Sequence, residues 1–242
     1  MTYVTPRHLA ADPGGWSGSP SRGRFGPVLL YLHGFASGPS SHKATVLSGR
    51  FRALGVPLTI PDLTPGPDGF ERSSPSSMLA VARAALAGGT PPHAIIGSSL
   101  GGYLAALLAS GDASIERLFL MAPAFRLFER WERRLGRAEV ERWRRDGLET
   151  MHHATGRNRR LGWQFFEDAR RLPPFPEVKV PALCIAGRRD ETVPLADVAA
   201  FVERTPTARL VEVDDGHELA ASLDRIFEEA RAFLAPGAGS PR

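Results

Sequence analysis

One short segment carries a residue that could act as an activated nucleophile. Within residues 93–104, the run Gly97-Ser98-Ser99-Leu100-Gly101 lies between an apolar stretch typical of a buried strand and an apolar stretch typical of a helix. A sharp strand-to-helix turn strains its central residue and requires small neighbours. Such a turn lifts the Ser99 hydroxyl out of the sheet, and the helix N-terminus behind it favours developing negative charge. We therefore predict that Ser99 is a nucleophile.

A serine hydroxyl is a weak nucleophile until a base accepts its proton and an acidic group orients that base. Among the seven histidines, His217 alone lies between the last predicted strand and the last predicted helix, so we predict that it is the base. The preceding strand is followed by Asp190, which we predict to be the acid, with Glu191 as a near rival. Asp214 is too close to His217 in the chain to reach the far side of its ring.

Nucleophilic attack on a carbonyl also requires hydrogen-bond donors for the oxyanion that develops. The residue after the nucleophile supplies one donor, the backbone N–H of Leu100. The turn His33-Gly34-Phe35 follows another predicted strand, and we expect the N–H of Phe35 to be the second donor. We interpret His33 as a residue that holds this turn by hydrogen bonds, and we also place it among the candidate substrate-pocket residues.

The elements that must position these residues alternate between strands and helices. Such an alternation predicts an α/β fold with a mostly parallel sheet of about six to seven strands and helices on both faces. In such a sheet the functional loops gather at the carboxyl ends of the strands, where Ser99, Asp190 and His217 all lie. The predicted strands are 28–32, 56–60, the apolar run 93–96 before Gly97, 117–121, 180–186 and 209–213, and the main predicted helices are 44–54, 76–87, 195–204 and 218–234.

The alternation is interrupted once, which defines the expected domain organisation. Residues 124–172 contain two or three amphipathic helical stretches and no convincing strand, so we predict a helical lid inserted into a core formed by 28–123 and 173–234. Residues 1–27 are expected to be a loose N-terminal arm, and residues 235–242 a disordered tail.

The lid is rich in aromatic and basic residues. Aromatic side chains at helical spacing are more often packed than in contact with ligands, but a lid must cover the core opening. We therefore expect some of them to line an apolar pocket. The segment has 13 arginines and eight acidic residues, largely alternating, which indicates an ion-paired surface rather than a nucleic-acid groove. The candidate pocket residues are His33, Phe128, Trp131, Trp163 and Phe166.

Composition excludes several other classes. The 242 residues carry a net charge of +4, and no apolar run approaches the roughly 20 residues of a membrane span. No secretory signal is visible, so we expect a cytoplasmic protein. The single cysteine, Cys184, lies in a predicted strand and is interpreted as a core residue. His152 and His153 are adjacent and lack a carboxylate cluster, so we expect no metal site. The sequence does not determine the oligomeric state.

The run Leu30-Tyr31-Leu32-His33-Gly34-Phe35-Ala36-Ser37-Gly38-Pro39-Ser40-Ser41-His42-Lys43-Ala44, together with Gly97-Ser98-Ser99-Leu100-Gly101-Gly102-Tyr103, resembles the small bacterial YqiA-like esterases of the α/β-hydrolase superfamily. The order Ser99, Asp190, His217 is also that of α/β-hydrolases. The resemblance spans about 28–234. It implies a serine hydrolase that cleaves carboxylic esters through an acyl-enzyme without a cofactor, with Phe35 and Leu100 forming the oxyanion hole. The lid is a departure, because members similar in the core are often shorter there.

These observations predict a hydrolase that acts on small or medium apolar acyl esters or thioesters, with a small-molecule acyl substrate as its partner. An amidase or peptidase and an acyltransferase could use the same three residues, and sequence does not separate them from an esterase. A hydrolase fold without activity, used for binding through the basic lid, is the alternative from another class. Retention of all three groups at matching strand ends favours the enzyme.

Overall fold

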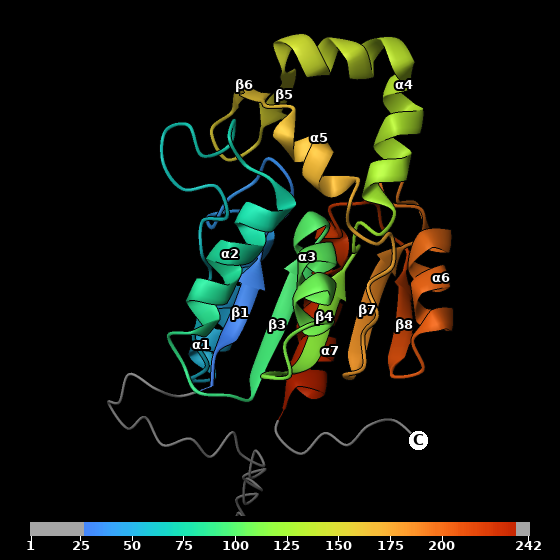
Figure 1. Cartoon of the computed structure of the whole chain (residues 1–242). Helices are drawn as coiled ribbons and strands as arrows, with labels where there is room; N and C mark the ends of the chain where they lie inside the picture. Colours follow the sequence, from blue (N-terminus) through green and yellow to red (C-terminus); the bar gives the residue numbers. More distant parts are fainter. Residues whose placement is uncertain (1–26, 236–242) are drawn as a thin grey trace, which may run out of the picture.

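A computed structural model describes residues 27–235 of the chain (Figure 1). The predicted arm 1–27 and tail 235–242 therefore lie, except for one residue each, outside the described residues. The strands are β1 (Leu29–Leu32), β2 (Leu58–Thr59), β3 (His93–Ser98), β4 (Ile115–Met121), β5 (Leu148–His152), β6 (Arg157–Leu161), β7 (Ala182–Gly187) and β8 (Ala208–Val213). The helices are α1 (His42–Ala53), α2 (Pro75–Leu86), α3 (Leu100–Ala109), α4 (Leu127–Asp146), α5 (Gln164–Ala169), α6 (Leu195–Arg204) and α7 (Leu223–Leu234), with a 3₁₀ turn at Ala220–Ser222.

The main sheet has six parallel strands in the order β2-β1-β3-β4-β7-β8, which confirms the predicted fold class. The chain passes from β1 to β2 in one direction across the sheet and from β3 to β4 in the other, so the strand order reverses between β1 and β3. Crevices at the carboxyl ends of strands beside such a reversal are the usual ligand sites of α/β sheets. The strand register brings loops together, because Leu32 of β1 pairs with Gly97 of β3, and Gly187 of β7 pairs with Val213 of β8.

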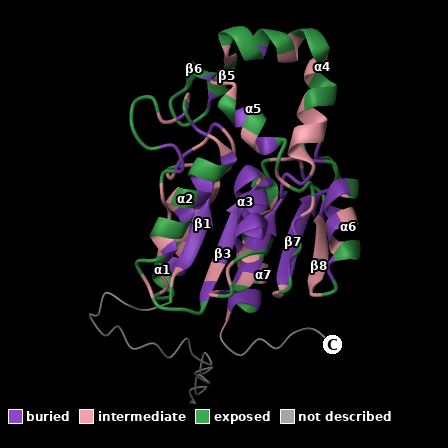
Figure 2. Cartoon of the chain, in the orientation of Figure 1, coloured by how far each residue is buried: buried purple, intermediate pink, exposed green. Residues whose placement is uncertain are grey.

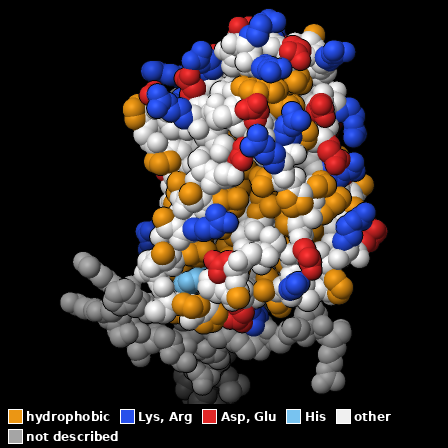
Figure 3. All heavy atoms as spheres, viewed as in Figure 1, with side chains coloured by type: hydrophobic (Ala, Val, Ile, Leu, Met, Phe, Trp, Pro, Cys, Tyr) orange, Lys and Arg blue, Asp and Glu red, His pale blue; other side chains and the backbone are white. Residues whose placement is uncertain are grey.

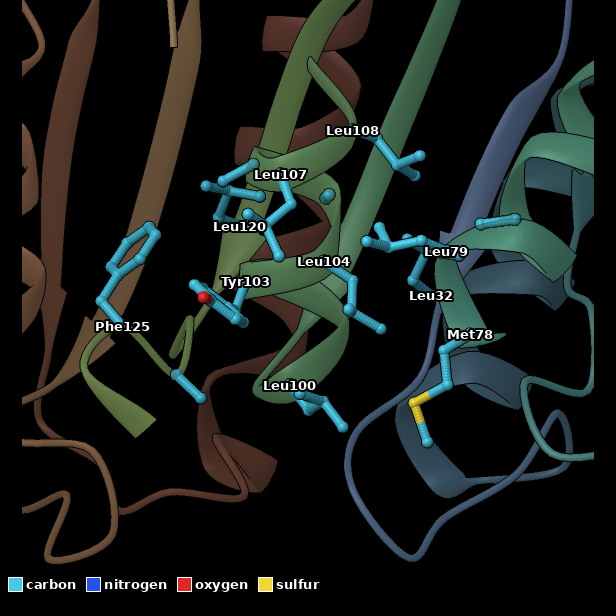
Figure 4. Packing of buried hydrophobic residues seen from close by; sticks show 14 of the residues in the cluster. Leu32, Met78, Leu79, Leu100, Tyr103, Leu104, Leu107, Leu108, Leu120 and Phe125 are labelled. Atoms are coloured by element: carbon cyan, nitrogen blue, oxygen red, sulfur yellow. The ribbon is translucent and has the colours of Figure 1, made fainter. Parts of the chain in front are cut away.

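Helices cover both faces of the sheet, as predicted (Figure 1). On one face α1 and α7 bury side chains such as Phe51 and Ile226 against the strands. On the other face α2, α3 and α6 form the larger core, in which α3 is apolar on all sides and nearly every residue is buried. Figure 4 shows Leu104 and Leu107 of α3 packed among side chains of α2, β1 and β4. A helix that is apolar all round is a fully buried one, and it gives Ser99 a rigid base.

Most predicted boundaries are displaced by one or two residues, and two of the displaced elements have a clear structural reason. β2 comprises Leu58–Thr59 rather than 56–60, as it is an edge strand that pairs with β1 alone. The last helix was predicted from residue 218, but α7 begins at Leu223 after a 3₁₀ turn. The reason is local: Leu219 has a φ of 53°, in the left-handed region, which interrupts helical geometry.

Residues between β4 and β7 form a layer above the carboxyl ends of the strands (Figure 1), but the prediction that they contain no strand was wrong. β5 and β6 form an antiparallel hairpin between α4 and α5. Its turn uses Gly156 at a φ of 64°, which favours glycine, and the turn amides of Thr155 and Gly156 donate to the His152 carbonyl. The sequence of β6 shows no alternation of apolar and polar residues, because most of its side chains are charged or polar and face solvent.

α4 consists of two helical pieces joined at Gly136, whose φ of 72° and ψ of 166° break the helix. Trp143 is its single buried residue, and most of the helix is coloured as exposed or intermediate in Figure 2. Some of the expected ion pairs form, including Arg126–Glu129 and Arg142–Glu139. Figure 3 shows basic side chains mixed with acidic ones over this part of the molecule. Within residues 27–235, no helix combines the length and apolar character needed to cross a bilayer.

Candidate active site

Ser99 occupies the turn between β3 and α3 in a strained conformation, with φ 52° and ψ −118°. Two neighbouring glycines permit it. A Cβ on Gly97 would lie 2.5 Å from the carbonyl oxygen of Gly101, and a Cβ on Gly101 would lie 2.1 Å from that of Leu32. Both distances are far below van der Waals contact, so the strand, the turn and the helix can approach this closely only without side chains at these two positions.

Ser99, His217 and Asp190 form a continuous hydrogen-bonded chain. The Nε2 atom of His217 lies 3.1 Å from the Ser99 Oγ, and the Nδ1 atom lies 2.8 Å from Asp190 Oδ2. The paired ends of β7 and β8 bring the loops of Asp190 and His217 together, and β3 delivers Ser99 to the same edge. In this arrangement Nδ1 donates to the carboxylate, which leaves Nε2 free to accept the serine proton.

Asp190, rather than Glu191 or Asp214, faces the histidine. Its side chain is 1 % exposed, and its Oδ1 accepts hydrogen bonds from the backbone N–H groups of Thr192 and Val193 at 2.8 and 2.7 Å. Those bonds fix the carboxylate so that Oδ2 points at the imidazole. Glu191 is exposed at the rim of the cavity, and Asp214 is paired with the exposed Arg189.

Sequence reasoning did not single out Asp215, which supports the loop of His217. Its carboxylate accepts from the Gly216 N–H at 2.8 Å and from both the N–H and the hydroxyl of Ser222 at 3.0 Å. The side chain therefore ties the loop after β8 to the turn before α7. The sequence offers little to identify this role of Asp215. Asp214 and Asp215 are adjacent acidic residues in one loop, and only their contacts in the fold distinguish them.

The two predicted oxyanion donors lie beside the nucleophile. Leu100 is the first residue of α3, and N–H groups in the first turn of a helix have no partner within the helix. A Cβ on Gly34 would lie 3.5 Å from the Ser99 Cβ, so the loop after β1 lies against the Ser99 turn. Among the described residues, none accepts a hydrogen bond from the Phe35 N–H. Both amides are thus available to an oxygen bound above Ser99.

His33 is not among the residues that line the cavity and instead holds the loop after β1. It is 2 % exposed. Its Nε2 accepts from the Leu63 N–H at 3.2 Å, and its Nδ1 lies 3.0 Å from the Gly34 carbonyl, to which it donates. Both ring nitrogens are used, so the neutral tautomer with a proton on Nδ1 fits this site. The prediction of a structural role agrees with these contacts, and its place in the pocket group was wrong.

This environment predicts a pH dependence of stability. Burial lowers the pKa of His33 below its ordinary 6.5, so below that pH the unfolded chain binds a proton that the folded chain does not. Stability should therefore fall as pH falls from 7.5 to 5.5. Denaturant unfolding at both pH values should show a smaller pH-dependent loss for His33→Gln than for the wild type. Equal losses in the two proteins would contradict this assignment.

A cavity of about 920 Å³ opens above Ser99 and His217. Of the predicted aromatic pocket residues, Trp131 lines this cavity, and its ring lies 5.0 Å from that of Phe35. Phe128, Trp163 and Phe166 do not belong to the lining, and we correct that prediction. The other lining residues include polar groups that the prediction missed, namely Tyr31, Ser37, Ser40, Ser41, Lys43, Ser98, Arg130, Arg133, Arg134, His153, Glu191, Thr192 and Glu218.

The three excluded aromatics pack with one another instead. The Phe166 ring lies 4.5 Å from Phe128, 4.5 Å from Trp163 and 5.2 Å from Trp143, centroid to centroid. The indole N–H of Trp143 donates to the Leu161 carbonyl at 2.9 Å. This cluster joins α4, the hairpin and α5 into one packed unit. These mutual ring contacts explain why aromatic content alone did not identify pocket residues.

Other reactive side chains lie outside the cavity. Cys184 is fully buried in β7, and burial raises the pKa of its thiol, which suits the predicted core role. Among residues 27–235, no group of three or more His, Cys, Asp or Glu side chains is arranged to hold a metal ion.

The sequence model of the uncharacterised protein family UPF0227 matches residues 28–235, which is most of the chain. The chain belongs to this family. Membership confirms the resemblance to the YqiA-like branch of the α/β-hydrolase superfamily. None of the curated proteins matches this UPF0227 chain.

Several solved structures are similar to the UPF0227 chain. Mouse alpha/beta hydrolase domain-containing protein 10 is 17 % identical with a TM-score of 0.68, covering 86 % of this chain and 89 % of its own. Est1E from Butyrivibrio proteoclasticus, solved with ferulic acid bound, is 20 % identical with a TM-score of 0.73. The match covers 89 % of this chain and 90 % of Est1E. A structure from a study of the metagenome-derived lipolytic enzymes LipS and LipT is 20 % identical with a TM-score of 0.65. The match covers 87 % of this chain and 94 % of that structure. At these identities the similarity establishes the α/β-hydrolase fold.

Proposed function

We propose that this protein is a serine hydrolase that cleaves carboxylic esters or thioesters of small to medium apolar acyl groups. The observation that carries the proposal is the hydrogen-bonded chain from Ser99 through His217 to the buried Asp190 at the floor of a cavity. Est1E and the structure from the study of the lipolytic enzymes LipS and LipT are similar to this chain in fold, and their names support a hydrolase.

In the first half of the reaction, Ser99 Oγ attacks the carbonyl carbon of the ester while His217 Nε2 accepts the hydroxyl proton. The negative charge that develops on the carbonyl oxygen is stabilised by the N–H groups of Phe35 and Leu100 and by the N-terminus of α3. Asp190 stabilises the imidazolium that forms. Collapse of the tetrahedral intermediate breaks the bond to the leaving group, which takes the proton from His217 and departs.

In the second half, water attacks the acyl-enzyme with His217 again accepting a proton. The second tetrahedral intermediate collapses to release the carboxylic acid, and Ser99 Oγ recovers its proton. The apolar part of the cavity, formed by Phe35, Leu127, Trp131 and Val193, suits an acyl group of modest length.

A fluorophosphonate probe tests the proposal, because it forms a stable adduct with activated serines. Intact-mass measurement should show one adduct on the wild type and none on Ser99→Ala. Ser110→Ala removes a serine hydroxyl at the opposite end of α3 and should be labelled like the wild type. Folded wild-type protein that stays unlabelled and does not hydrolyse 4-nitrophenyl butyrate would refute the proposal and support the non-catalytic alternative.

A further inference from the structure

The wall of the cavity formed by α4 is unusually basic for a pocket that is otherwise suited to an apolar acyl group. The helical piece before the Gly136 break contributes Leu127, Arg130, Trp131, Arg133 and Arg134 to the lining. Three of these five side chains are guanidinium groups. They share a cavity with Ser99 and His217, so a substrate held at the nucleophile lies within the field of these charges.

Three of the charged groups that line the cavity are already neutralised by partners. Lys43 pairs with Glu218 at 3.0 Å, and its ammonium also donates to the Glu218 carbonyl. Arg130 is mostly buried and pairs with Asp197, which lies on α6. Its guanidinium also donates to the Phe125 carbonyl, so Arg130 is held as a structural link between α4 and α6.

Arg133 and Arg134 differ from these groups. Both are exposed, and within residues 27–235 neither forms an ion pair or a side-chain hydrogen bond. Two carboxylates line the cavity. Glu218 is paired with Lys43, and Glu191 forms no ion pair within the described part of the chain. The cavity therefore carries an excess of positive charge, located on two adjacent guanidinium groups.

The position of these two arginines also distinguishes them from the basic surface that the sequence predicts. Beyond the Gly136 break, Arg142 pairs with Glu139 and Arg145 approaches Asp146, in agreement with an ion-paired, solvated face. None of these residues lines the cavity. Basic and acidic residues therefore alternate along the whole of α4. Before the break at Gly136, however, the unpaired guanidinium groups of Arg133 and Arg134 lie at the cavity.

We propose that Arg133 and Arg134 bind an anionic oxygen group of the substrate, so that the preferred substrate is an ester that carries a carboxylate or a phosphate as well as an apolar part. This inference rests on the proposed hydrolase function. Guanidinium groups present planar sets of donors that match the oxygens of carboxylates and phosphates. Trp131 lies between Arg130 and Arg133 in the same wall and offers the apolar contact.

The experiment compares esters that differ by one charge. For an anion in the acyl group, 4-nitrophenyl hydrogen glutarate is compared with 4-nitrophenyl valerate. For an anion in the leaving group, 4-carboxyphenyl butyrate is compared with 4-carbamoylphenyl butyrate. In at least one pair, the wild type should show a kcat/KM about tenfold higher for the charged ester, mainly through KM, as expected for a charge-assisted hydrogen bond. The pair that shows the preference identifies the side of the substrate that carries the anion.

The double variant Arg133→Gln/Arg134→Gln should reduce that ratio to about one. Arg144→Gln/Arg145→Gln removes the same charge from the same helix outside the cavity, and it should keep the wild-type ratio. A ratio that is unchanged in the first variant, or near one in the wild type for both pairs, overturns the inference while leaving the hydrolase intact. Absence of hydrolysis of all four esters together with absence of fluorophosphonate labelling overturns the hydrolase proposal as well.

Discussion

The Asp190→Asn variant is expected to lose about 10⁴-fold in kcat for ester hydrolysis while keeping its fold. The carboxylate accepts a hydrogen bond from the Nδ1–H group of His217 at 2.8 Å, and an amide at this position would present a donor or stabilise the wrong tautomer of the ring. The amide oxygen can still accept from the N–H groups of Thr192 and Val193, so the loop should stay in place. Steady-state kinetics and circular dichroism of the purified variant provide the measurement.

Two matched variants show whether the loss is specific. Asp214→Asn removes the same charge from the loop of His217, but its carboxylate is 72 % exposed and paired with Arg189, so its kcat should stay near that of the wild type. Glu191→Gln should lose far less activity than Asp190→Asn. If Glu191→Gln were the more damaging change, Glu191 would be the orienting acid and our assignment would be wrong.

The Gly101→Ala variant is expected to be destabilised by about 3 kcal/mol or more, and to lose activity with it. Its Cβ would lie 2.1 Å from the carbonyl oxygen of Leu32 and 2.6 Å from that of His33. Both atoms belong to the backbone, so relief requires β1 and α3 to separate, which would displace Ser99. Denaturant unfolding followed by circular dichroism would measure the loss.

Gly49→Ala is the control for this change. Gly49 lies in α1, and a Cβ there would meet no atom within 4 Å. Because alanine has the higher helix propensity, this variant should be as stable as the wild type or gain about 0.5–1 kcal/mol. Equal stability of Gly101→Ala and Gly49→Ala would show that α3 and β1 do not approach as closely as described.

The fold and the three residues of the hydrogen-bonded chain could be predicted because local patterns carry them. Each buried parallel strand is a short apolar run, and its end is visible where polar residues begin. Ser99, Asp190 and His217 each follow such an end, and parallel strands share one carboxyl edge. The bounds of α6 were predicted to the residue, since amphipathic spacing persists along the whole helix.

The order of strands and helices, and the identity of the residues at the strand ends, therefore follow from local sequence patterns. The choice between Asp190 and Glu191 depends on the tertiary structure, because the imidazole of His217, from the loop after another strand, lies 2.8 Å from the Asp190 carboxylate while Glu191 stays exposed. The tertiary structure also separated Trp131 from the packed aromatics and placed Arg133 and Arg134 at the cavity. Those outcomes depend on contacts between segments far apart in the chain and on the break at Gly136, and no local periodicity records them.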